Sequence, residues 1–254
     1  MNFTGIIPAR YASTRFPGKP LVIIQGKSMI QRVYEQAKRS KKLSDVVVAT
    51  DDKRIADHVK SFGGKFIMTS AKHRTGTERC AEVSKKLRLS NKDVVINIQG
   101  DEPFIDPAQI DVVCKCFENK ETQIATLVKK ISDTKELFNP NVVKAVFDKN
   151  NFALYFSRNP IPYLREDKQE NWLKQHDYYK HIGIYGYKAE VLAALVKLKS
   201  TALEKAESLE QLRWLENGYK IKIQETKLES VAIDTPNDLE VISNFKFQIS
   251  NSGK

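Results

Sequence analysis

Near its start the chain reads FTGIIPARYASTRFPGKP, residues 3–20, and this stretch decides the fold. Phe3 to Ile7 is a short apolar run of the kind that forms a buried strand. A polar loop rich in positive charge follows it directly. In a parallel sheet, the loop at the carboxyl end of a strand faces the ligand crevice. The stretch therefore predicts an α/β protein with its ligand site beside the first strand.

Strand-like and helical patterns alternate through the rest of the first half. Runs typical of buried strands stand at 45–49, 66–68 and 94–98, and apolar residues recur at helical spacing over 29–37 and 55–62. Thr75-Gly76-Thr77-Glu78 has the pattern of a capping box that opens another helix, through Leu87. This order predicts a mostly parallel central sheet with helices on both faces.

The pattern changes after about Ser132. Strand-like runs stand at 142–147, 153–156 and 181–187 without full helices between them, and 165–179 is polar and loop-like. Later elements are expected as helices at 189–198 and 206–217, a strand at 220–224 and a last helix opened by Thr235-Pro236. No internal repeat or low-complexity linker divides the chain. Residues 1–254 therefore predict one α/β domain with a mixed α+β insertion at about 132–200.

The composition is that of an ordinary soluble globular protein, with 254 residues, 41% hydrophobic and 29% charged. No stretch approaches the roughly 20 apolar residues of a membrane helix, and no signal-peptide pattern precedes the first strand. Cys80, Cys114 and Cys116 form no CxxC pair, which argues against zinc and for reduced thiols. We expect a cytoplasmic protein without a membrane partner.

A formal net charge of +11 raises nucleic-acid binding as an alternative function. The lysines, however, are scattered along the chain and do not form an arginine-rich tract with aromatic stacking residues. We interpret most of them as solvated surface charge and expect no nucleic-acid partner. A positive field would still help to gather anionic small molecules.

The loop after the first strand concentrates cations. Arg10, Arg15 and Lys19 stand close together beside Ser13, a combination of forked and compact positive charges that suits a triphosphate. The loop is not a P-loop, because Pro20 stands where that motif requires Ser or Thr after Gly-Lys. The sequence also lacks GxGxxG. Kinase and dehydrogenase functions therefore lose their main support.

Two carboxylates stand at the ends of predicted elements, one after a strand and one before a helix. Asp101, in Gln99-Gly100-Asp101-Glu102-Pro103, ends the strand at 94–98 and would suit Mg²⁺, although a polar turn explains the same residues equally well. Asp234 precedes Thr235-Pro236. Taken singly, it is better explained by helix capping and the helix dipole.

Together these motifs resemble the CMP-Kdo synthetases, the cytidylyltransferases of 3-deoxy-manno-octulosonate (Kdo), over nearly the whole chain. The matching segments are 6–15, 17–21, 48–51, 76–79, 99–103, 139–144, 153–158, 181–187, 209–213 and 234–236. One departure stands before the last helical motif. Residues 200–204 read Ser-Thr-Ala-Leu-Glu, where the family usually has a Ser-Pro-Leu-Glu run, and this change could soften the loop leading to Glu210. It leaves 8-amino-Kdo as a rival substrate and sialic acid as a weaker one.

The resemblance implies a Rossmann-like nucleotidyltransferase fold, CTP and Kdo as substrates, Mg²⁺ as cofactor, and a homodimer formed largely through the insertion, which would also bind sugar. Nucleotide binding is implied for Pro8, Ala9, Arg10, Ser13, Arg15, Lys19 and Arg79, and a catalytic role for Arg15, Lys19 and Asp101. Metal binding is implied for Asp101 and Asp234. Sugar contacts are implied for Gln99, Arg158, His181, Tyr185, Glu210 and Gln211.

Several of these residues also have simpler explanations. His181 could hydrogen-bond locally within a strand, and Arg158 could be an ordinary surface ion-pair partner. Glu210 and Gln211 could form the polar face of a helix whose buried face is apolar. For these residues the resemblance, not the spacing, supports a role in the site. The reaction it implies is attack of the Kdo anomeric hydroxyl on the α-phosphorus of CTP, with pyrophosphate leaving.

Overall fold

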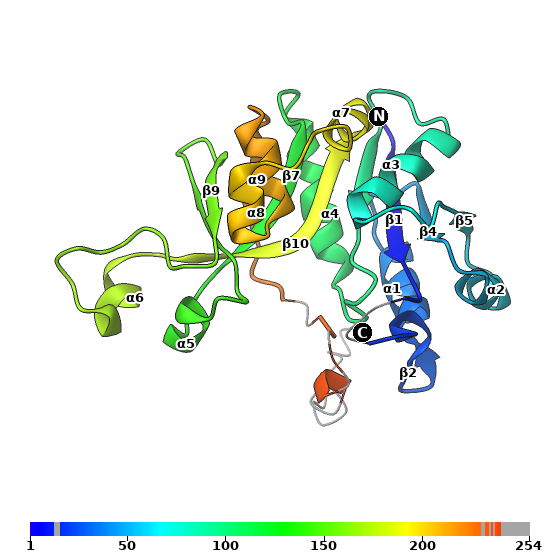
Figure 1. The fold of residues 1–254 in the computed structure, drawn as a ribbon, viewed down its shortest axis with the longest axis horizontal. Helices are drawn as coiled ribbons and strands as arrows, with labels where there is room; N and C mark the ends of the chain where they lie inside the picture. The colour runs from blue at the N-terminus through cyan, green and yellow to red at the C-terminus, as the bar shows by residue number, and fades with distance from the viewer. Residues whose placement is uncertain (13–15, 230–231, 234, 236, 240–254) are drawn as a thin grey trace, which may run out of the picture.

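A twisted β-sheet forms the centre of the molecule (Figure 1). The computed structural model describes residues 1–12, 16–229, 232–233, 235 and 237–239. The sheet order is β11 (Ile221–Glu225), β7 (Ile124–Lys130), β10 (Tyr179–Lys188), β6 (Val94–Asn97), β1 (Phe3–Ala9), β4 (Asp45–Thr50) and β5 (Phe66–Met68). Strand β10 runs antiparallel to both of its neighbours, whereas the other neighbouring pairs on this path are parallel. The prediction of a mostly parallel sheet is confirmed.

Helices cover both faces of this sheet, as the sequence predicted. One face carries α1 (Met29–Lys38), α2 (Lys53–Ser61) and α4 (Pro107–Lys115), and the other carries α3 (Gly76–Lys86), α7 (Ala189–Leu195) and α9 (Glu210–Glu216). Ile30, Ile55 and Ile110 are fully buried in the first core. Leu192 and Trp214 are buried in the second. The sequence analysis assigned neither α4 nor β7.

The start of α3 is capped differently from the expected capping box. The Thr75 hydroxyl accepts a hydrogen bond from the Glu78 amide at 3.2 Å, as predicted. The Glu78 carboxylate, however, accepts from the amide of Arg74 at 2.6 Å instead of returning to Thr75. The Glu78 carboxylate thus binds the residue before the N-cap, and this bond fixes the backbone of Arg74 beside the start of α3.

The region after Ser132 reaches away from the main body (Figure 1). It contains α5 (Thr134–Phe138), β8 (Lys144–Phe147), β9 (Ala153–Ser157), the 3₁₀ turn η3 (Gln169–Asn171) and α6 (Trp172–Gln175). Strand β10 begins in this region and continues into the middle of the sheet, with a shift of register between Ile182 and Tyr185. Strands β8 and β9 extend the same sheet, because β8 pairs with β10 at Lys180 and with β9 along its length.

The helix expected at 206–217 consists of two helices. Helix α8 (Ala202–Glu207) ends at Ser208, which has a left-handed φ of 53°, and α9 follows. The stretch without proline begins α8, where the Thr201 amide donates to the Glu204 carboxylate at 3.3 Å. This stretch is therefore the start of a helix and not a loose loop. Of the last predicted helix, 237–239 are helical, and Thr235 before them donates from its amide to the Asp238 carboxylate at 2.7 Å; Pro236 and residues 240–254 lie outside the described residues.

In the described ranges, none of the helices has the length and apolar character that crossing a membrane requires. Short elements complete the fold. The 3₁₀ turn η1 (Lys19–Leu21) leads into a small hairpin of β2 (Ile23–Ile24) and β3 (Lys27–Ser28), which precedes α1.

Candidate active site

A polar cleft of about 240 Å³ opens at the carboxyl ends of β1 and β6. Its lining residues are Pro8, Ala9, Arg10, Lys19, Pro20, His73, Arg74, Thr75, Gly76, Arg79, Gln99, Gly100 and Asp101. Strands β1 and β6 are parallel neighbours, so the loops that follow them meet at one edge of the sheet. The structure thus brings together the predicted phosphate loop and the predicted carboxylate motif, which are far apart in the sequence.

A glycine permits the close approach of these two loops. A Cβ atom on Gly100 would stand 2.7 Å from the backbone oxygen of Pro8, a contact that real Cβ atoms essentially never make. Any larger residue would therefore push the two strand ends apart. Gly100 sets the width of the cleft at the point where β1 and β6 both end.

Lys19 and Asp101 form an ion pair across the cleft. Lys19 Nζ donates to Asp101 Oδ2 at 2.8 Å, and their side chains are 13% and 30% exposed. A cation and a carboxylate are therefore held side by side where a charged ligand can reach both. The other predicted residues of this loop lie differently: Arg10 is exposed at the rim, and Ser13 and Arg15 lie outside the described residues.

The base of the phosphate loop is fixed by Tyr11. The Gly18 amide donates to the carbonyl of Tyr11 at 3.0 Å, which closes the loop on itself. The guanidinium of Arg54, from α2, lies 3.3 Å from the centroid of the Tyr11 ring. This cation–π contact ties the loop to the helix that follows β4. The sequence analysis assigned no role to Tyr11 or Arg54.

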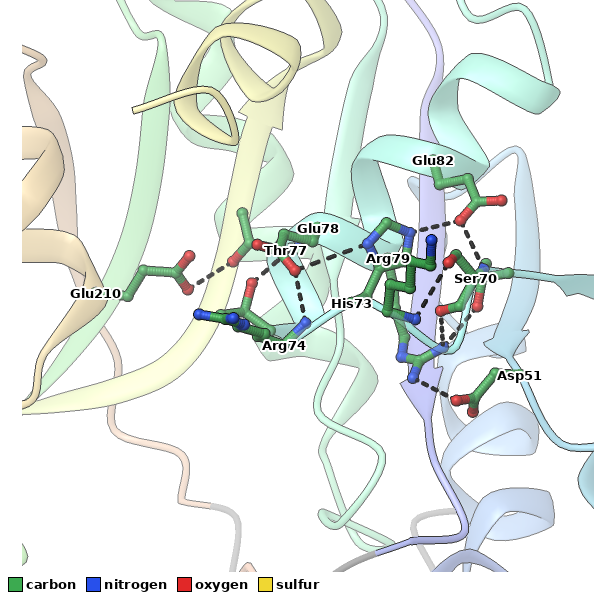
Figure 2. Close-up of polar contacts among 12 residues, drawn as sticks. Asp51, Ser70, His73, Arg74, Thr77, Glu78, Arg79, Glu82 and Glu210 are labelled. Atoms are coloured by element: carbon green, nitrogen blue, oxygen red, sulfur yellow. Dashed lines mark hydrogen bonds and ion pairs between the residues drawn. The ribbon is translucent and has the colours of Figure 1, made fainter. Parts of the chain in front are cut away.

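Arg79 is buried beneath the cleft and supports it (Figure 2). Its guanidinium donates to Asp51 at 3.0 Å and to the Thr69 hydroxyl at 2.7 Å. These bonds join α3 to the residues that follow β4 and β5. They give a structural role to the family segment 48–51, because Asp51 at its end binds Arg79. The contact predicted between Arg79 and the nucleotide stays a prediction.

The sequence analysis missed the wall formed by His73, Arg74, Thr75 and Gly76. His73 Nε2 lies 2.5 Å from the Glu82 carboxylate, which also accepts from the Ser70 amide at 2.8 Å (Figure 2). Although burial alone would raise the pKa of Glu82, hydrogen bonds from Lys86, Ser70 and His73 lower it to about 2. Glu82 is thus a carboxylate that orients His73. The helix start at Thr75 was the signal for this wall, because helix N-termini at a ligand edge attract anions.

On the sugar-binding side, predicted residues gather around β10. Gln99 donates from Nε2 to the carbonyl of Gly183 at 2.9 Å, linking the end of β6 to the irregular part of β10. His181 and Tyr185 have their rings 5.2 Å apart on the same strand. Burial raises the pKa of Tyr185 well above its usual value, so the phenol is neutral.

His181 makes the local hydrogen bond that the simpler explanation anticipated. Its Nε2 lies 2.9 Å from the Thr126 hydroxyl, which donates to the carbonyl of Ile184 at 2.8 Å. Nε2 therefore carries the proton, and Nδ1 is the acceptor nitrogen. Burial lowers the pKa of His181 to about 3, so the ring is neutral at pH 7.

Glu210 reaches across from α9 to α3 (Figure 2). Its carboxylate accepts from the Thr77 hydroxyl at 2.8 Å and from Arg213 at 2.6 Å. Burial raises the pKa of Glu210 despite these bonds. Because Thr77 follows the cleft residues Thr75 and Gly76, this contact places Glu210 beside the cleft. Its neighbour Gln211 is buried.

Arg158 binds backbone carbonyls. Its Nε donates to the carbonyl of Glu207 at 2.7 Å and its Nη1 to the carbonyl of Pro140 at 3.0 Å. It therefore holds α8 against the loop before β8. The surface ion pair considered for it from the sequence is not its principal contact.

Asp101 is the metal-binding candidate that the structure describes. Asp234, its predicted partner, lies outside the described residues. Within the described part of the chain, no group of three or more His, Cys, Asp or Glu side chains could hold a metal ion. Mg²⁺ usually takes one or two protein carboxylates and fills its remaining positions with water and substrate phosphates. A lone carboxylate beside a phosphate-binding loop fits that donor set.

Several known proteins similar to this chain carry the same activity in their names. The family described as cytidylyltransferase matches residues 4–223. The 3-deoxy-manno-octulosonate cytidylyltransferases of Parabacteroides distasonis and Bacteroides thetaiotaomicron are 58% and 56% identical to the chain; the matches cover 94% and 96% of it, and 96% and 98% of those proteins. A solved structure of CMP:2-keto-3-deoxy-manno-octonic acid synthetase complexed with CTP is 41% identical. It superposes with a TM-score of 0.88 over 95% of this chain and 97% of that one.

Proposed function

The chain belongs to the family of 3-deoxy-manno-octulosonate cytidylyltransferases, and we propose that it transfers CMP from CTP to the anomeric hydroxyl of Kdo, releasing pyrophosphate. The observation that carries this proposal is the cleft at the ends of β1 and β6. There the Lys19–Asp101 pair lies beside the backbone of Pro8 and Ala9 and the exposed Arg10. Phosphate-binding cations and a carboxylate suited to a hard metal ion meet at the ligand edge of the sheet.

The reaction asks the protein mainly for positioning and charge. The sugar hydroxyl attacks the α-phosphorus in line with the leaving pyrophosphate, and negative charge gathers on the phosphate oxygens. Lys19 and Arg10, with Ser13 and Arg15, would hold the triphosphate, while Pro8, Ala9 and Arg79 shape the nucleoside end. Asp101 and Asp234 would hold Mg²⁺. The ion, when bound, neutralises phosphate charge and makes a bound hydroxyl more acidic.

The sugar acid would lie toward β10 and α9. Gln99, Tyr185, Glu210 and Gln211 offer the donors and acceptors that a polyhydroxylated chain needs, and Arg158 holds the neighbouring loop. With a pKa of about 3, His181 is a weak proton acceptor, so it would act as a neutral hydrogen-bonding partner and not as a general base. The names of the close relatives favour Kdo over 8-amino-Kdo and sialic acid.

A homodimer is the second part of the proposal. A hollow of about 620 Å³ lies on the insertion, where β8 residues such as Phe147 meet Ile161 and Tyr179. Tyr163 and Leu154, also in the insertion, are 71% and 62% exposed. Exposed aromatic and aliphatic side chains, together with a hollow in the same region, are typical of a surface that another chain covers. A cytoplasmic location is proposed as well, supported by the three buried free thiols.

The test is pyrophosphate release by the purified full chain in the presence of MgCl₂. CTP, UTP, ATP and dTTP are compared with Kdo as acceptor, and Kdo, 8-amino-Kdo and sialic acid are compared with CTP as donor. We expect release with CTP and Kdo, slower release with the amino sugar, and little with sialic acid. Preference for another nucleotide would overturn the cytidylyltransferase proposal, whereas preference for another sugar would overturn only the acceptor assignment.

A further inference from the structure

A buried lysine stands where the insertion joins the central sheet. Lys180, near the start of β10, is 7% exposed, and its ammonium bonds two carboxylates, Glu136 of α5 and Glu229 beyond β11. Burial would lower the pKa of Lys180, but the two carboxylates outweigh burial and raise it. The lysine is charged, and its charge is balanced by Glu136 and Glu229, which lie far apart in the sequence.

Glu229 belongs to the segment that follows β11, described at 226–229 and 232–233, which we call the C-terminal strap. The Glu229 carboxylate also accepts from Lys129 of β7 at 2.5 Å. The Thr226 amide donates to the carbonyl of Val128 at 2.8 Å, which continues the pairing with β7. The strap is therefore tied to the sheet by backbone at its beginning and by two lysines at Glu229.

Further along, the strap reaches the cleft. Ile233 is fully buried against Ile24 and Met29, next to the hairpin that follows the phosphate loop. Its amide donates to the carbonyl of Asp101 at 2.9 Å. The carboxylate of that same Asp101 holds Lys19. Through this contact, the strap fixes the backbone of the residue that stands in the cleft.

We infer that Lys180 and Glu229 are positioning residues, which hold the C-terminal strap on the sheet and thereby set the place of Asp101. The inference rests on the proposed function, in which Asp101 takes part in the reaction. Glu229→Gln takes one of two carboxylates from the buried Lys180 and weakens both side-chain bonds that hold the strap, whereas Lys180→Met removes one of those two bonds and leaves Lys129. A displaced Asp101 lowers turnover, whereas the nucleoside end of the cleft, at Pro8 and Ala9, is held by other contacts and still binds CTP.

The experiment compares Glu229→Gln, Lys180→Met and the double variant, with Lys130→Met as the matched control. Lys130 lies next to Lys129 on β7, but its partner is the exposed Asp177 at 2.6 Å, away from the strap. Three quantities are measured: kcat and KM for CTP and Kdo, hydrogen exchange of a peptide covering 226–239, and the melting temperature. The exchange measurement needs no substrate, so it stands even if wild-type turnover of CTP and Kdo fails.

We expect Glu229→Gln to lower kcat about tenfold, because small misplacements of reacting groups cost at least that much. The KM for CTP should stay within about twofold, since the nucleoside end is unchanged. Exchange in 226–239 should accelerate, and the double variant should be no worse than the single ones because the residues act as one unit. Lys130→Met should behave as wild type.

Two results would overturn the inference: unchanged kcat in Glu229→Gln with accelerated exchange, or reduced kcat with exchange as slow as in wild type. The first would show that the strap does not position Asp101, and the second that the ion pair does not hold the strap. An equal loss of kcat in Lys130→Met would also overturn it, because loss of a lysine that does not bind Glu229 would then have the same effect. Glu229 is partly exposed, so its variant tests the inference even if Lys180→Met fails to fold.

Discussion

Charged side chains around the cleft form ion pairs, and the solvent exposure of each pair indicates its role. The Arg79–Asp51 pair is enclosed, with Arg79 4% exposed, and supports the walls. The Lys19–Asp101 pair lies in the open cleft, where an incoming ligand can replace either partner. A pair that a ligand can open serves binding, whereas an enclosed pair is costly to break.

The open pair should therefore govern activity more than stability. We expect Asp101→Asn to abolish most pyrophosphate release and Lys19→Met to lower kcat/KM for CTP at least tenfold, since a charge-assisted hydrogen bond contributes about 1.5–3 kcal/mol. The free energy of unfolding of both variants should stay within about 1 kcal/mol of the wild-type value. The control is Lys27→Met, which breaks an exposed ion pair between Lys27 of β3 and Glu35 of α1. Near wild-type activity in Lys19→Met would contradict the assignment of the phosphate loop.

Glu82 gives a pH-dependent prediction at the same scale. Its pKa is lowered from 4.5 to about 2, so the carboxylate stabilises the fold fully above pH 4.5 and loses that contribution as the pH falls toward 2. Glu82→Gln should cost about 1–2 kcal/mol at pH 7. The difference from wild type should shrink as the pH falls below 4.5. Urea unfolding at several pH values measures this, and a difference that stays constant with pH would contradict it.

Among the elements, the loops after β1 and β6 depend on how closely their strands end. We expect Gly100→Ala to cost about 1–3 kcal/mol of stability, because the new methyl group meets the carbonyl of Pro8. It should also lower kcat, since widening this edge separates Lys19 from Asp101. Gly218→Ala serves as control: its φ of 80° makes alanine unfavourable, but its site is far from the cleft, so stability falls by about 1 kcal/mol with kcat unchanged. Equal kcat in both variants would contradict the role given to Gly100.

Elements with a strong local pattern were predictable from sequence. β4 and β6 contain continuous apolar runs, and α1 buries Met29, Ile30, Val33, Tyr34 and Ala37 at helical spacing. β7 escaped prediction although its apolar start is buried, because it ends in Lys129 and Lys130. What makes such lysines compatible with a strand is a partner contributed from elsewhere, as Glu229 is for Lys129.

The candidate site divides in the same way. Pro8, Ala9, Arg10 and Lys19 of the phosphate loop and the carboxylate motif at Asp101 lie in the cleft, as their positions after strands predicted. In the wall, Thr75 and Gly76 could be recognised as a helix start, whereas His73 and Arg74, between β5 and that helix, carry no motif and were missed. The contact between Thr77 and Glu210 depends on how α3 and α9 pack. No local pattern contains that information, and only the resemblance to a family suggested that Glu210 belongs to the site.

At the scale of the whole molecule, the proposed homodimer places the second copy on the insertion. We expect Tyr163→Asp combined with Leu154→Asp to convert a dimer into monomers, because each puts a charge in place of an exposed side chain of the insertion. Ile23→Asp is the control, since Ile23 is also 62% exposed but lies in the β2–β3 hairpin. Size-exclusion chromatography with light scattering gives the mass. A monomeric wild type, or a dimer that survives the double substitution, would contradict the proposal.

Strand β10 belongs both to the projecting arm and to the centre of the sheet, and this limits how the protein can be recombined. A chimera that exchanges 132–200 with a relative replaces a central strand together with its arm, so the foreign strand must match β6 and β7 side chain for side chain. An exchange that stops at Tyr178 leaves β10 with its native neighbours β6 and β7 but still replaces β8, which pairs with β10 at Lys180. The unit that can be exchanged is therefore smaller than the stretch that the sequence marks as an insertion, because β8, β9 and β10 all belong to the sheet.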